Sequence, residues 1–171
     1  MIKEKNIDSI SMAKKENFGF MLLEIIISIA IITIVFVTLS GIGVLVINTS
    51  SSIRNETKAD FLMKEEFEAV RNFRDGTTWA TDGLGAVNTG SGNPYYLTNN
   101  LGNWALVSGT EIDGVFTRKV IFDKVSRDPV THDIEDIYNP TNNDSDTRKI
   151  TVIITWQGKT SQVVSYFTNW K

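Results

Sequence analysis

A long apolar run near the N-terminus dominates the pattern of hydrophobic and polar positions. It covers residues 25–47 and contains no charged side chain. Its polar members are small hydroxyl residues, which can hydrogen-bond back to helix carbonyls: Ser28, Thr33, Thr38 and Ser40. At 1.5 Å per residue, these 23 residues form a helix of about 34 Å. A hydrocarbon core is roughly 30 Å thick, so the run predicts a membrane-spanning helix.

The helical pattern continues beyond this run in amphipathic form. After a polar patch at residues 48–52, apolar residues recur at helical spacing and form one face: Ala59, Leu62, Met63, Phe67, Val70 and Phe73. Only Glu66 interrupts this face. Asp75-Gly76 predicts the end of the helix, with Gly76 in the left-handed cap position. The pattern predicts one helix of about 55 residues, apolar all round in its first half and amphipathic in its second.

The remainder of the chain is typical of loops and β-strands. Residues 76–103 are rich in Gly, Asn, Thr and Ser, which predicts a loop with one short strand at 95–97, and Trp79 and Trp104 are expected to hold it against the domain. Residues 123–147 are polar and acidic. Alternating or apolar segments predict the other strands: 104–107, 115–122, 148–156 and 160–167, the last two joined by a turn at 157–159. A long helix followed by antiparallel strands predicts an α+β fold in which a small sheet covers the amphipathic half-helix.

Composition excludes several kinds of chemistry. The 171-residue chain has no cysteine, which excludes disulfides, iron–sulfur clusters and thiolate zinc sites. Its single histidine, His132, excludes a multi-histidine metal site and is expected on a surface loop. The net charge of −3 argues against nucleic acid binding. No phosphate-binding loop or nucleophile elbow is present, so we expect no enzyme activity and no cofactor.

One carboxylate stands at the start of the apolar run. Glu24 follows Leu22 and Leu23 and precedes Ile25, and a charge in such a helix costs several kcal/mol. Together with Gly19, Phe20 and the long span, Glu24 resembles the processing site and helix of type IV prepilins and pseudopilins. The C-terminal strands are also similar to those of minor pilins and minor pseudopilins. Many type IV pilins carry a C-terminal disulfide loop, which a chain without cysteine cannot form.

The resemblance implies a maturation step and an assembly contact. A membrane peptidase would cut after Gly19 and methylate the new amino group of Phe20. Glu24 would pair with the Phe20 amine of a neighbouring subunit, and the alternative is a carboxylate that reaches the headgroup region. Gly41 and Gly43 would form a soft point in the helix, although a small-residue contact surface between helices explains them equally well.

The resemblance also divides the chain into four segments. These are a leader at 1–19, a transmembrane and assembly helix at 20–47, its amphipathic half at 48–75, and an extracytoplasmic loop and sheet at 76–171. The leader has four lysines against three acidic residues, which favours a cytoplasmic N-terminus, and Met12 is an alternative start to Met1. The implied partners are other pilin subunits, a prepilin peptidase, an assembly platform and the cytoplasmic membrane.

Other interpretations remain open at this point. A secretory signal peptide has a shorter apolar region and a small-x-small cleavage site, and neither fits residues 25–47. A signal anchor, or a membrane-anchored extracytoplasmic binding domain that never polymerises, explains the span but not Glu24 beside Phe20. A pilus, a secretion pseudopilus and a DNA-uptake filament all fit the sequence. Five acidic residues crowd one loop, where calcium binding is the alternative to a solvated hairpin: Asp133, Glu135, Asp136, Asp144 and Asp146.

Overall fold

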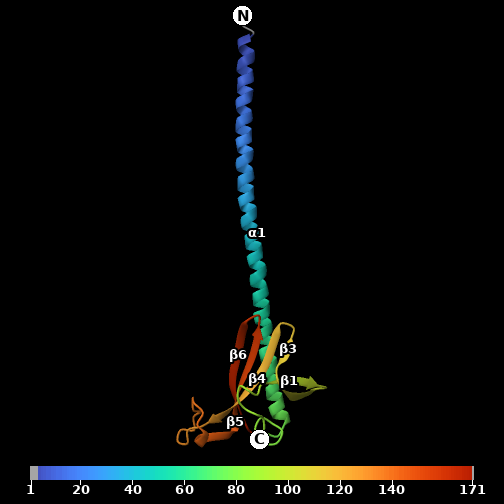
Figure 1. Ribbon diagram of the computed structural model, residues 1–171, viewed down its shortest axis with the longest axis vertical. Helices are drawn as coiled ribbons and strands as arrows, with labels where there is room; N and C mark the ends of the chain where they lie inside the picture. The colour runs from blue at the N-terminus through green and yellow to red at the C-terminus, as the bar shows by residue number, and fades with distance from the viewer. Residues whose placement is uncertain (1–3, 171) are drawn as a thin grey trace. The chain divides into compact units, whose positions relative to one another are not determined.

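The computed structural model describes the backbone of residues 4–170 and the side-chain environment of residues 19–170. One helix is followed by an antiparallel sheet (Figure 1). The elements in chain order are α1 (Glu4–Gly76), β1 (Tyr95–Asn100), β2 (Asn103–Ser108), β3 (Glu111–Asp113), β4 (Phe116–Ser126), the 3₁₀ helix η1 (Pro140–Asn142), β5 (Asn143–Trp156) and β6 (Lys159–Thr168). Two compact units divide the chain, Met1–Ser52 and Ile53–Lys171, and α1 contributes residues to both. The α+β prediction is confirmed.

Helix α1 is longer than the predicted 55 residues. It has 73 residues and begins at Glu4, so no helix boundary marks the predicted junction after Gly19. It ends at Gly76 as expected, but the prediction of a left-handed cap is wrong, because Gly76 is not among the glycines with positive φ. The hydroxyl of Thr77 instead donates to the carbonyl of Phe73 at 2.7 Å, which satisfies one of the orphan carbonyls of the last turn.

The six-stranded sheet has the order β2-β1-β4-β5-β6, and the short β3 pairs with β4 outside this path. All pairings are antiparallel. The 148–156 strand is confirmed and extends back to Asn143, while β4 continues to Ser126, so the predicted polar loop shrinks to residues 127–142. The turn between β5 and β6 is also confirmed, with positive φ at Gln157 and Gly158 as a tight primed hairpin requires.

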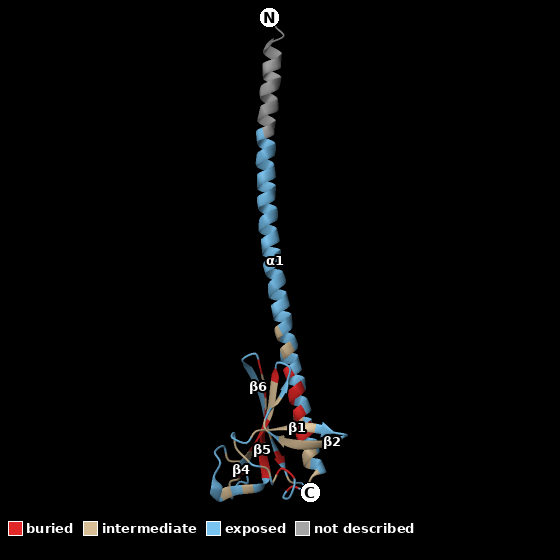
Figure 2. Ribbon diagram, turned by 45° about the vertical axis from the view of Figure 1, so that its right-hand side comes forward, coloured by how far each residue is buried: buried red, intermediate tan, exposed pale blue. Residues whose placement is uncertain are grey.

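The core of the second unit lies between α1 and one face of the sheet. The predicted helix face is confirmed: Ala59, Leu62, Met63 and Val70 are buried, and Phe67 and Phe73 pack against the same core. Among the described residues of α1, Figure 2 shows buried ones only in the part beside the sheet. The sheet contributes alternate residues, as strand geometry requires: Val120, Phe122, Ile150, Val152, Ile154, Trp156 and Phe167.

The loop after α1 is held to the sheet by a tryptophan, as predicted for Trp79. Its indole N–H donates to the carbonyl of Ser145 at 3.0 Å. The buried Arg148 donates to the carbonyl of Gly85 at 2.8 Å, and its guanidinium lies 5.9 Å from the Trp79 ring. A Cβ at Gly85 would meet the Trp79 ring at 2.5 Å, so this close approach requires glycine. Trp104 lies in β2, where the strand 104–107 was predicted, and it is half-buried against the core.

The packing of α1 predicts a contrast between its two faces. Val70 is fully buried, so Val70→Asp should lower the free energy of unfolding by more than about 3 kcal/mol, because it places a charge in the core. Lys64 is exposed, and Lys64→Asp should cost less than about 1 kcal/mol. Urea unfolding of the chain from Ser50 onward measures both. Equal urea midpoints for the two variants would contradict the packing described here.

Candidate functional site

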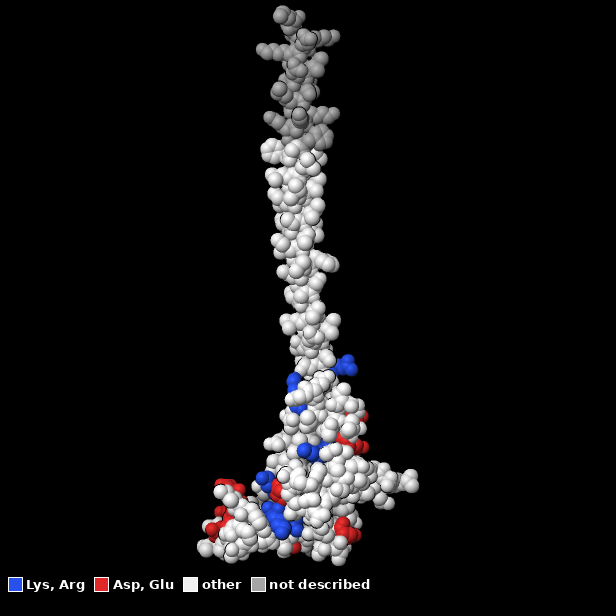
Figure 3. Space-filling view, in the orientation of Figure 1, with Lys and Arg blue, Asp and Glu red and all other residues white. Residues whose placement is uncertain are grey.

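The first unit presents an apolar helix without a cover. Large apolar side chains from Phe20 to Ile47 are about half exposed or more, including Phe20 at 74% and Phe36 at 71%. Glu24 is the one charged residue of this segment, and no charged side chain is visible on the face of it that Figure 3 shows. A surface of this kind needs a membrane or other helices around it. The helix is long and apolar enough to cross a membrane, and a signal sequence near an N-terminus meets the same description.

Three of the four hydroxyl residues inside the apolar segment, Thr33, Thr38 and Ser40, bond within the helix, as predicted. Thr33 donates to the carbonyl of Ile29 at 2.7 Å, and Ser40 donates to that of Phe36 at 2.8 Å. Thr38 donates to the carbonyls of Val35 and Ile34 at 2.8 and 3.1 Å. These bonds reduce the cost of placing the hydroxyls in hydrocarbon.

The predicted processing and assembly residues lie on successive turns of α1. Phe20 and Glu24 are four residues apart, which places them on the same face of the helix. Glu24 is the sole charged residue between Gly19 and Arg54, and within the described part of the chain no ion pair forms at it. A charged partner for this carboxylate would therefore come from outside residues 19–170 of this chain.

The three glycines of this segment occupy open helix surface. A Cβ at Gly19, Gly41 or Gly43 would meet no atom within 4 Å. Helix α1 runs through Gly41 and Gly43 without interruption. Their predicted role as a soft point stays a prediction.

A buried carboxylate connects α1 with the sheet in the second unit. Glu66, read from the sequence as an interruption of the apolar face, is 0% exposed. Its Oε1 accepts the backbone N–H of Leu97 in β1 at 2.9 Å. Its Oε2 lies 3.5 Å from a guanidinium nitrogen of Arg118 in β4, without a hydrogen bond. One side chain of the helix thus contacts two strands.

Arg118 gathers three acidic residues around it. The Arg118 side chain is 12% exposed, and its guanidinium forms a close ion pair with Glu111 of β3 and lies 3.7 Å from Glu65. Burial raises the pKa of Glu66 to about 7, because the charged carboxylate loses its contact with water. The Leu97 hydrogen bond and the charge of Arg118 lower the pKa but do not offset burial. The cluster links α1 to β1, β3 and β4. Its only signal in the sequence is Glu66, a polar residue inside an apolar helix face.

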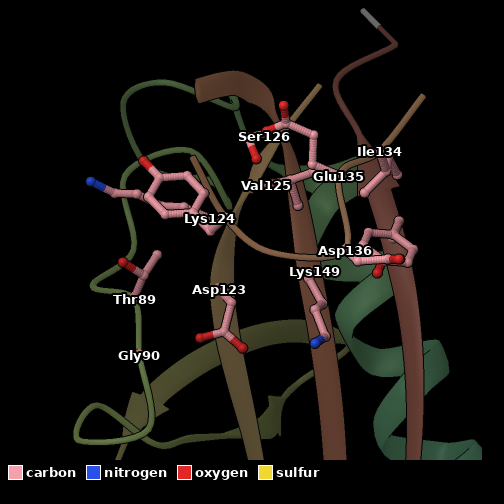
Figure 4. A pocket seen from close by; sticks show the side chains of 12 residues that line it. Thr89, Gly90, Asp123, Lys124, Val125, Ser126, Ile134, Glu135, Asp136 and Lys149 are labelled. Carbon is pink, nitrogen blue, oxygen red and sulfur yellow. The ribbon is translucent and has the colours of Figure 1, made fainter. Parts of the chain in front are cut away.

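A polar cleft lies on the sheet near the 127–142 loop (Figure 4). Its volume is about 380 Å³. Asp123, Lys149 and Tyr166 stand opposite one another on β4, β5 and β6, and Figure 4 shows the first two extending toward the same space. Glu135 and Lys124 also line the cleft. This mixture of charges suits a small polar ligand but brings together no nucleophile and base, so the expectation of no enzyme activity stays a prediction.

Asp144 and Glu135, two of the five acidic residues singled out in this region, accept hydrogen bonds from nearby residues. Asp144 accepts from Arg127 at 2.6 Å and from its neighbour Asp146's N–H at 2.9 Å, and Glu135 accepts from Asn142 at 2.8 Å. Among residues 19–170, no three histidine, aspartate or glutamate side chains converge in a way that could hold a metal ion. His132 is exposed in the 127–142 loop, as predicted, and its φ is 63°.

Comparison with known proteins leaves the architecture as the main guide. No protein-family model, curated protein or solved structure matches this chain. A long apolar N-terminal helix packed on an antiparallel sheet is a pilin-like architecture, and it fits a membrane-anchored protein.

The raised pKa of Glu66 predicts a pH-dependent stability. The folded state binds this proton more tightly than the unfolded state, whose pKa is near 4.5, so the contribution of Glu66 falls as pH rises from 4.5 to about 7. The fall is a few kcal/mol at most, at about 1.4 kcal/mol per pKa unit. Glu66→Gln keeps the acceptor for Leu97 and should remove this fall. Urea unfolding of both proteins between pH 5 and 8 tests it, and a stability difference that does not change with pH would contradict it.

Proposed function

We propose that this chain is a structural subunit, of the minor class, of a type IV pilus or a secretion-type pseudopilus. It is inserted in the cytoplasmic membrane through residues 20–47, cleaved after Gly19, N-methylated at Phe20 and assembled through its hydrophobic helix. Its N-terminus lies in the cytoplasm and its sheet domain outside. The observation that carries the proposal is α1 itself, one continuous helix whose apolar first half is uncovered and whose second half packs on a sheet.

The state of Glu24 supports assembly over simple anchoring. A carboxylate among leucines and isoleucines costs free energy in a membrane, and the chain offers it no partner among the described residues. A neighbouring subunit that has been cut after Gly19 would supply the Phe20 amine. A desolvated ion pair of this kind forms in one register only, so it would set the position of one helix beside the next.

The proposed partners follow from this life cycle. A prepilin peptidase would cleave and methylate the chain, other pilin or pseudopilin subunits would pack against its helix, and an assembly platform would extract it from the membrane. The alternative is an anchored extracytoplasmic domain that never polymerises, and Glu24 separates the two.

Gly19→Arg should block maturation. A Cβ at position 19 meets open space, so the substitution leaves the chain's own helix intact, and its effect would fall on the approach of the peptidase to the backbone. Gly43→Ala is the control, because it also faces open space and should mature normally. Mass spectrometry of the membrane fraction measures the N-terminus. A Gly19→Arg protein that begins at Phe20, or a wild-type protein that keeps residues 1–19, would refute the cleavage site.

Glu24→Ala should insert in the membrane as well as the wild type or better, because it removes a charge from an apolar helix. It should nevertheless be depleted from sheared filaments, because the Phe20 amine of the neighbouring subunit loses its partner. Ser28→Ala is the matched control, since it lies one turn further along the same face and removes a polar group without removing a charge. Normal amounts of Glu24→Ala in filaments would favour the anchored domain.

A further inference from the structure

Strand β6 forms one edge of the sheet. It has ten residues, pairs with β5 in an unbroken register from Lys159 to Thr168, and has no partner strand on its other side within the described part of the chain. The outward backbone groups of such a strand are available for pairing with another chain.

This edge lacks the features that usually prevent pairing. Natural sheets protect their edges with prolines, bulges and charged side chains. Strand β6 contains no proline and no register shift, and its one charged residue, Lys159, stands at its first position, where it bonds to Glu56 at 2.6 Å. The nine residues that follow carry no charge.

A groove runs beside this edge, between β6 and α1. Its volume is about 280 Å³, and its apolar lining consists of Met63 and Phe67 from α1 and Val163 from β6. Val163 faces the same side as Phe167, four residues along the strand. Phe167 is 5% exposed, whereas Val163 is 36% exposed. The sheet thus covers the apolar face of α1 less completely near Val163 than near Phe167.

Charged residues of α1 line the rim of the groove. Asp60, Lys64 and Glu68 are its charged members. Glu68 is bonded to Arg71 at 2.9 Å, and Lys64 lies 6.0 Å from the ring of Phe61. Asp60 therefore offers a carboxylate that favours a cationic side chain on whatever fills the groove.

We propose that β6 and this groove bind an extended segment of another protein, which joins the sheet as an additional strand. Its backbone would pair with the outer edge of β6, its alternate apolar side chains would enter the groove over Met63 and Phe67, and a lysine or arginine would face Asp60. A second copy of this chain is a poorer occupant. Phe167 of its own β6 already packs in its own core, so that side chain cannot also fill this groove. The inference does not depend on cleavage after Gly19.

The test uses the full chain in detergent micelles and a fluorescent peptide. The peptide alternates valine and threonine, carries one central lysine, and has about nine residues, enough to follow β6 at 3.3 Å per residue. The same peptide with two central prolines is the control, because it cannot pair along a strand edge. We expect the first peptide to bind and to slow amide hydrogen exchange in residues 159–168, without effect on the opposite edge strand β2.

Two substitutions on one strand separate the groove from the rest of the edge. Val163→Asp places a charge in the groove and should weaken peptide binding by at least about tenfold. Val164→Asp lies on the opposite face of β6 and should change it by less than about threefold. Equal effects, or no protection of residues 159–168, would overturn the proposal. Protection that depends on protein concentration without peptide would assign the edge to a second copy and would also overturn it.

A charge reversal tests the groove without a change to its apolar lining. Asp60 is exposed, so Asp60→Lys should leave the fold intact. It should weaken the lysine peptide and strengthen a peptide with glutamate in place of the lysine. Unchanged preference between the two peptides would overturn the assigned charge of the partner.

Discussion

The second unit depends on a buried carboxylate at the contact between α1 and the sheet. An apolar residue at position 66 would pack against the strands in several sliding positions, whereas Glu66 must meet both the Leu97 N–H and the Arg118 guanidinium. Losing the Leu97 bond would leave the buried Oε1 without a hydrogen bond, and losing Arg118 would leave the buried carboxylate without its counter-charge. Either loss costs more than an ordinary surface contact is worth. The carboxylate therefore fixes the register of the helix against the sheet, in addition to the apolar contacts around it.

The same contact explains how β1 stays in the sheet. Strands β4 and β5 pair from Phe116 to Ser126 with one register shift after Lys124, but β1 pairs with β4 through one residue pair, Tyr95 and Val120. The N–H of Leu97, two residues beyond this pair, is bonded to Glu66 of the helix instead. The hairpin of β1 and β2 is thus attached to the domain by a helix side chain as well as by strand pairing. Arg118 also connects β3 to this cluster through its ion pair with Glu111.

The parts predicted from the sequence are those with strong periodicity. Helix α1 and the hairpin of β5 and β6 follow from regular spacing, because burial on one face imposes that spacing. Glu66 was read as an interruption because its partners lie 31 and 52 positions away, and no local pattern reports them. The C-terminal end of β4 and the N-terminal end of β5 are not predictable from the sequence for a related reason. Their polar residues are paired across strands and with the 127–142 loop, so polarity there does not indicate a loop. In the candidate site, Glu24 follows from its unusual position, whereas the groove beside β6 depends on where the sheet ends.

The exposed apolar surface of α1 does not stop where a membrane span could end. Ile53 is 56% exposed and Phe61 is 65% exposed, and both lie beyond the polar patch that follows residue 47. A domain that was merely anchored would gain nothing from an exposed phenylalanine more than three helical turns past its span, because water would surround it. A subunit whose helix packs beside other helices over a longer distance would cover both residues. The continued exposure of apolar side chains along one helix therefore supports the proposed assembly through α1 independently of Glu24.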